Sequence, residues 1–72
     1  MRVTFDRAAN AAYIHLREIG SGEVHETVNA DGKHTRGMVN LDFDKKGRLI
    51  GIEVLDATRA LPQEVLDAAQ RI

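Results

Sequence analysis

The sequence predicts a two-layer α+β domain, an antiparallel β-meander of about five strands with one face covered by a C-terminal helix. Apolar and polar residues alternate through residues 2–55, which is the period of half-buried strands. Beyond Pro62 the apolar residues follow helical spacing instead. The 72 residues form a single domain, and one sheet with one helix is the simplest way to bury one apolar face.

The N-terminal part predicts two strands separated by the turn-like segment "DRAAN". The first strand, "RVTFD", places Val3 and Phe5 on one side. The second, "AAYIHLR", places alternate residues Tyr13, His15 and Arg17 on the side opposite its apolar residues. The glycines of "GSG" at residues 20–22 predict the next turn.

The middle of the chain predicts three further strands. "EVHETVN" is the weakest, and a polar segment at 29–37, expected to be a mobile loop, separates it from "MVNLDFD". In "RLIGIEVLD", Ile50, Ile52 and Val54 are expected to face the core. The opposite side of this strand then carries Leu49, Gly51, Glu53 and Leu55.

The C-terminal helix is expected over about residues 62–71, with Pro62 in its first turn. Its apolar stripe consists of Leu61, Val65, Leu66, Ala69 and Ile72. The preceding "DATRA" predicts a single helical turn with Asp56 as N-cap.

The segment "DFDKKGRLIGIE", residues 42–53, has nearly the spacing of an EF-hand calcium loop. However, Lys46 stands where that loop requires an oxygen ligand, and both flanks alternate like strands. The segment therefore predicts a β-hairpin, with Asp44 opening a type I turn and Gly47 in the left-handed conformation.

The outer sheet face carries the candidate polar residues Tyr13, His15, Asp42 and Glu53, which are group types used in acid–base chemistry. His15 and His25, if they lie on neighbouring strands, would form a weak divalent-metal or hydrolytic site with Asp42 or Glu53. Against this alternative, no catalytic, metal-binding or cofactor motif is present. The sequence does not favour an enzyme, and it predicts no catalytic residue, resident metal or cofactor.

The charge and composition of the chain limit the binding partners and cellular locations that we expect. The net charge is −1 and no basic stripe is visible, so nucleic acid is not favoured, although Arg2, Arg17, Lys45, Lys46 and Arg48 are the residues that would contact it. There is no cysteine, and no segment has the character of a signal peptide or membrane span. We therefore expect a cytoplasmic protein.

Small domains without disulfides often depend on a partner subunit. Tyr13, Leu49 and Leu55 add apolar surface to the outer face, and such patches mark interfaces. We therefore expect a structural or protein-interaction module that self-associates, with a dimer favoured and a protein partner as a further expectation.

Two segments, "FDRAANAAYIHL" and "VNLDFDKKGRLIGIEVLDAT", resemble the small bacterial proteins of the domain of unknown function 2283 family. The resemblance covers about Phe5 to Thr58, although Asn10 replaces the usual Asp and Ala12 the usual Leu. It implies an accessory or antitoxin-like role beside a small toxin-like partner. It also supports the hairpin, with Gly51 leaving room on the outer face for a bulge or for another backbone.

Asp42 and Glu53 are expected on the two arms of this hairpin, both pointing away from the core. If they are near neighbours, their like charges require a cation, a proton or a base from a partner nearby.

Overall fold

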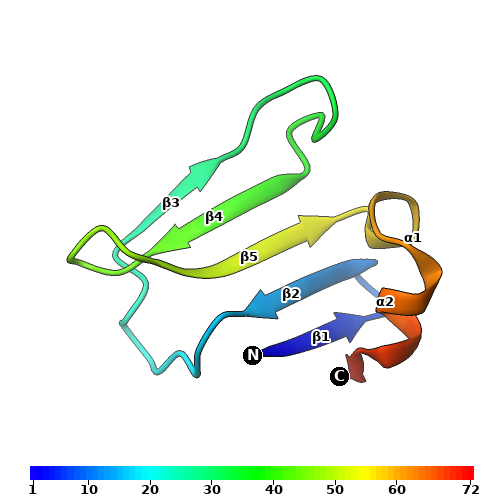
Figure 1. The fold of residues 1–72 in the computed structure, drawn as a ribbon, viewed down its shortest axis with the longest axis horizontal. Coiled ribbons are helices and arrows are strands. Elements are labelled where there is room, and N and C mark those ends of the chain that lie inside the picture. Colours follow the sequence, from blue (N-terminus) through cyan, green and yellow to red (C-terminus); the bar gives the residue numbers. More distant parts are fainter.

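The computed structural model describes residues 1–72 and confirms the α+β class (Figure 1). The strands are β1 (Arg2–Asp6), β2 (Ala11–His15), β3 (Glu26–Asn29), β4 (Val39–Phe43), β5 (Leu49–Leu55) and β6 (Gln70–Arg71). The helices are α1 (Ala57–Ala60) and α2 (Gln63–Ala68). Neither helix has the length and apolar character needed to cross a membrane.

The six strands form one sheet in the order β3-β4-β5-β2-β1-β6. The meander holds within β1–β2 and within β3–β4–β5, but β2 pairs with β5 rather than with β3. The chain between β2 and β3 therefore crosses from one part of the sheet to the other. This order pairs Ile14 with Ile52 and Ala12 with Val54, so that the most apolar strands lie at the centre of the sheet.

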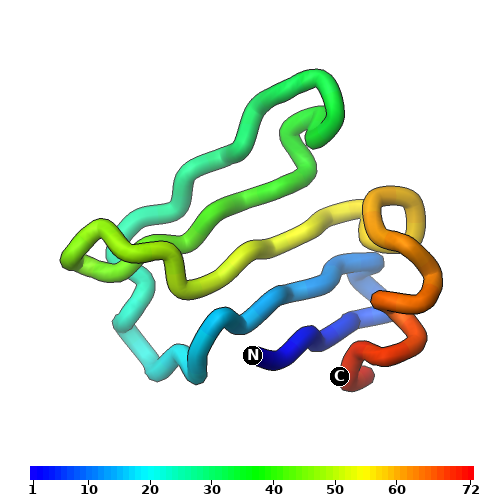
Figure 2. The backbone as a smooth tube through the Cα atoms, viewed as in Figure 1, coloured from blue at the N-terminus to red at the C-terminus, as the bar shows by residue number.

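The C-terminal helix is shorter than the sequence predicts. α2 ends at Ala68, and Gln70 and Arg71 then form β6, which pairs in parallel with β1. The Ile72 N–H donates to the Phe5 carbonyl at 3.1 Å, so the extended chain satisfies backbone groups on the open edge of β1. Ile72 is consequently exposed and not part of the apolar stripe. Figure 2 shows the C-terminal segment on the same edge of the sheet as the N-terminal strand β1.

The predicted helical turn at "DATRA" exists as α1, but Asp56 does not cap it through its side chain. Asp56 adopts a left-handed conformation, and the cap comes from Asn10 in the β1–β2 turn. The Asn10 carbonyl accepts from the Ala57 N–H at 3.0 Å, and its Oδ1 accepts from the Thr58 N–H at 3.1 Å. Asn10 thereby joins the first hairpin to the start of the helical segment.

The β4–β5 connection is the predicted hairpin. The Asp44 carbonyl accepts from the Gly47 N–H at 3.0 Å, and Gly47 has the left-handed φ of 76°. The Asp44 carboxylate faces into the turn, where Oδ1 accepts from the backbone N–H groups of Lys46 and Arg48, both at 2.9 Å. Its Oδ2 accepts from Arg48 Nε at 3.0 Å. The Asp44 carboxylate, at the third position of the EF-hand-like spacing, is thus bound within the turn.

A β-bulge in this hairpin changes one face assignment. Asp42 pairs with Gly51 but Phe43 pairs with Leu49, so Ile50 is the extra residue of β5. Directly paired residues share a face, which puts Leu49 on the apolar side with Phe43. The prediction that Leu49 lies on the outer face was wrong, because a bulge interrupts the alternation of side chains between the two faces of a strand.

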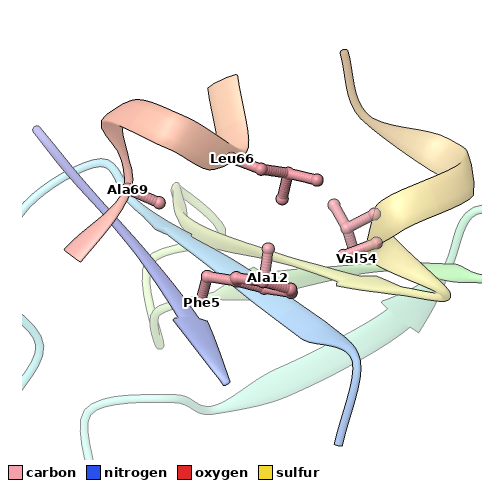
Figure 3. Close-up of a cluster of buried hydrophobic side chains, with 6 residues drawn as sticks. Phe5, Ala12, Val54, Leu66 and Ala69 are labelled. Carbon is pink, nitrogen blue, oxygen red and sulfur yellow. The ribbon is translucent and has the colours of Figure 1, made fainter. Parts of the chain in front are cut away.

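The hydrophobic core lies under the helices at one end of the sheet. Leu66 and Ala69 point toward Phe5, Ala12 and Val54 (Figure 3), and Ala57 completes the buried cluster. Three members of this cluster are alanine, so Phe5, Val54 and Leu66 supply most of its volume. No helix crosses β3 or β4 (Figure 1). The helices therefore cover only the half of the sheet built on β1, β2 and the end of β5.

Leu66→Ala should lower the free energy of unfolding by about 2–4 kcal/mol, because the small core cannot refill the cavity. Leu66 is 3% exposed, whereas Leu61 is half-buried at the margin. Leu61→Ala should therefore cost clearly less. Urea denaturation at one fixed protein concentration measures both variants, and equal losses would contradict the position of the core.

The hydrogen bonds from the Arg48 and Lys46 backbone and from the Arg48 guanidinium hold the pKa of Asp44 below its usual range. This stabilisation is present above the unfolded pKa, about 4, and is lost as the pH falls through the lower folded pKa. Asp44→Asn should lower the urea midpoint at pH 7 and flatten the acid limb of the stability profile. Glu18 and Glu23 also have lowered pKa values, so part of that limb should persist. An unchanged profile would contradict this role of Asp44.

Candidate functional site

The candidate polar residues from the sequence lie together on the outer face, the side of the sheet opposite the helices. Tyr13 and His15 come from β2, Asp42 from β4 and Glu53 from β5. Tyr13 pairs directly with Glu53 in the β2–β5 register, and its ring centroid lies 4.6 Å from that of His15. Alternation along each strand explains why these side chains share a face.

A first row of hydrogen bonds crosses the outer face from β3 to β2. Asp42 is only 8% exposed and receives two hydroxyl donors. The Thr27 hydroxyl donates to its Oδ1 at 2.6 Å, and the Tyr13 hydroxyl donates to its Oδ2 at 2.5 Å. These short distances are typical of hydroxyl–carboxylate bonds. We call this row Thr27–Asp42–Tyr13.

Gly51 makes this row possible. It lies on β5, between the strands that carry Asp42 and Tyr13. A Cβ atom added to Gly51 would overlap the Tyr13 ring and hydroxyl. The glycine that the sequence associates with a bulge or a close backbone thus leaves room for an aromatic side chain, which reaches across β5 to β4.

A second row runs parallel to the first. Asn29 Nδ2 donates to Asn40 Oδ1 at 2.8 Å, and Asn40 Nδ2 donates to Glu53 Oε1 at 3.0 Å. The expected neighbours Asp42 and Glu53 are therefore offset, because Asp42 pairs with Gly51 and Glu53 with Asn40. Each carboxylate accepts from neutral donors: two hydroxyls serve Asp42 and one amide serves Glu53. Hydrogen bonds from neutral donors, rather than the cation, proton or base that the sequence led us to expect for a close pair, therefore serve the two carboxylates.

Tyr13 is held in its protonated form. Burial, the hydrogen bond to Asp42 and the negative charges of Asp42 and Glu53 all raise the pKa of the Tyr13 phenol above its ordinary value. A protonated phenol donates a hydrogen bond and does not act as a base near neutral pH. The chemistry of this group is therefore that of a fixed donor to a carboxylate.

His15 extends the outer face toward β1. Its Nε2 lies 3.3 Å from the hydroxyl of buried Thr4, and its Nδ1 is buried without a hydrogen-bond partner. Burial and the nearby Arg2 guanidinium lower the pKa of His15, while Glu18 opposes this effect. These surroundings favour the neutral imidazole.

The metal hypothesis required His15 and His25 on neighbouring strands, and that placement was wrong. β5 and β4 separate β2 from β3, and His25 precedes β3 near the β4–β5 turn. No group of three or more His, Asp or Glu side chains is arranged to hold a metal ion. The acid–base hypothesis for the outer face stays a prediction from residue types.

Four residues of this network were not among the sequence candidates: Thr4, Thr27, Asn29 and Asn40. Alternation alone puts each of them on the outer face, so that signal was available. Their partners were not predictable, because register between distant strands depends on the crossover after β2.

The geometry describes a small α+β domain whose outer face is a hydrogen-bonded polar network. The chain belongs to the family described as "Protein of unknown function (DUF2283)", whose model matches residues 2–57. The match covers β1 to β5 and therefore both rows of the network. No curated protein and no solved structure matches the chain.

Tyr13 is the one tyrosine and there is no tryptophan, so tyrosinate absorbance reports this residue alone. In urea the phenol should ionise near pH 10. In the folded protein it should stay protonated well above that pH, and the Tyr13 contribution to stability should fall as the pH rises above about 10. Asp42→Asn should lower the titration midpoint of Tyr13 in the folded protein only part of the way toward the unfolded value, because burial is the largest cause of the raised pKa. Equal midpoints in folded and unfolded protein would contradict the buried hydrogen bond.

Gly51→Ala should lower the free energy of unfolding by about 1–3 kcal/mol, because its new methyl group overlaps Tyr13. The same substitution should cost about 1 kcal/mol less in a Tyr13→Ala background, where the obstructing ring is absent. A double-mutant cycle by urea denaturation measures this coupling. If the two free-energy changes are strictly additive, the glycine is required by the conformation of the backbone and not by its contact with the Tyr13 ring.

Proposed function

We propose that this chain is a protein-interaction module that self-associates, with a second copy covering the apolar half of the sheet that the helices leave open. The observation that carries this proposal is a patch of four apolar side chains on the helix side of the sheet, beyond the helices. We call it the uncovered patch: Val28, Leu41, Phe43 and Leu49.

The uncovered patch is continuous. Val28 pairs with Leu41, Leu41 pairs with Ile52, and Phe43 pairs with Leu49. Val28 is 42% exposed and Leu49 is 38% exposed, while Leu41 and Phe43 are half-buried by their neighbours alone. Contiguous apolar surface of this kind is typical of interfaces.

The total surface supports a subunit-sized contact. The chain exposes 4967 Å², whereas a folded monomer of this mass, 8.0 kDa, is expected to expose about 4450 Å². The excess of about 500 Å² is about five-eighths of the roughly 800 Å² that each partner contributes to a standard interface. The molecule is correspondingly flat, with extents of 33 × 28 × 18 Å.

A second copy is the occupant favoured by the position of the patch. The uncovered patch extends to β3, which is an edge strand. All four residues of β3 are exposed, and its outer backbone groups have no partner strand. A twofold axis near this edge would bring identical patches together, and twofold dimers are the commonest assemblies. An accessory partner protein on the same patch is the alternative, which a monomer mass at every concentration would favour.

Sedimentation equilibrium over a range of protein concentrations tests self-association. The wild-type chain should approach twice its monomer mass, and Val28→Lys should raise the dissociation constant at least about tenfold, because it buries a charge in the contact. Ala68→Lys adds the same charge to an exposed position on α2 and should leave the dissociation constant unchanged.

A monomer mass at every concentration would contradict the proposal. A dimer that Val28→Lys does not weaken would contradict the location of the interface. Circular dichroism of both lysine variants verifies that each still folds.

A further inference from the structure

A cavity of about 310 Å³ lies at the end of the sheet where the β4–β5 turn meets the crossover between β2 and β3. None of its lining residues is hydrophobic. Five basic residues are among those that line it, and we call it the turn-end pocket: Arg17, His25, Lys45, Lys46 and Arg48. Figure 1 shows both segments at this end, away from the helices.

The two carboxylates in this pocket are already engaged. Glu23 accepts from the Gly20 N–H and from Arg17 Nη1, the latter at 3.2 Å. Asp44 is 7% exposed and accepts from the Lys46 and Arg48 backbone and from Arg48 Nε. Both oxygens of Asp44 are therefore occupied, whereas Glu23 uses Oε1 for both of its hydrogen bonds.

Several donors of the pocket remain free. The ammonium groups of Lys45 and Lys46 form no ion pair, and Arg48 uses only Nε, which leaves its two terminal nitrogens available. Four permanent cations against two carboxylates leave a local charge of +2, on a chain whose net charge is −1. Positive charge is therefore concentrated at this concave end.

We propose that the turn-end pocket binds a small oxyanion of the phosphate class. Guanidinium and ammonium donors that line a concave polar site can form charge-assisted hydrogen bonds to such anions. A nucleic-acid strand fits this pocket less well than a small anion does, because the basic residues do not form a continuous stripe. Arg2, one of the residues expected to contact nucleic acid, lies outside the pocket and is paired with Glu18 at 3.0 Å. The pocket is separate from the uncovered patch, so neither proposal depends on the other.

Titration with inorganic phosphate, followed by amide chemical shifts at constant ionic strength, tests this site. Saturable shifts should concentrate in residues 17–25 and 44–48. The double variant Lys45→Met/Lys46→Met should bind at least about tenfold more weakly, because it removes two charge-assisted contacts while keeping the aliphatic stems. The matched control Lys33→Met/Arg36→Met removes equal charge from the β3–β4 connection and should bind like the wild-type chain.

Shifts that rise linearly without saturation, or that spread evenly over the surface, would overturn the proposal. An equal loss of affinity in the control variant would show that phosphate responds only to the net charge of the protein. That result would also overturn the proposal. A single-stranded oligonucleotide that binds the pocket when phosphate does not would replace the small anion with nucleic acid.

Discussion

Two short helices cover only half of one face of a six-stranded sheet, and most other features of the molecule follow from this constraint. The buried cluster is confined to the covered half and contains three alanines. Burial of apolar area is the dominant favourable contribution to folding, so β3 and β4 contribute little of it within one chain. They must be held by backbone pairing, by polar contacts on the outer face and, in our proposal, by a second copy.

The outer face supplies the polar contacts. The Thr27–Asp42–Tyr13 row joins β3 and β4 to β2 across Gly51, and the second row joins Asn29 and Asn40 to Glu53. Both rows connect the uncovered half of the sheet to the strands over the core. Asp42 is the buried member of these rows, and a buried polar group whose hydrogen bonds are satisfied favours one arrangement over its alternatives, which gives this carboxylate a structural role. That role does not exclude ligand binding at the turn-end pocket, which uses a different end of the sheet.

Local patterns were sufficient to predict β1 to β5, the β4–β5 hairpin and the outer-face position of Tyr13, His15, Asp42 and Glu53. Asp44 and Gly47 specify their turn through contacts within five residues, so the sequence signal was reliable there. The pairing of β2 with β5, the bulge that turns Leu49 to the apolar side and the cap from Asn10 all depend on contacts between distant segments. β6 likewise forms because β1 offers an open edge, and no periodicity in "AAQRI" predicts that.

The central claim is that the uncovered half of the sheet is the surface on which two copies meet. Isotope-filtered nuclear Overhauser spectra of a dimer mixed from labelled and unlabelled chains test it most directly. Contacts between chains should involve the methyl groups of Val28, Leu41 and Leu49. Contacts between chains that come only from the Tyr13 face, or their complete absence in a sample shown to be dimeric, would contradict the claim.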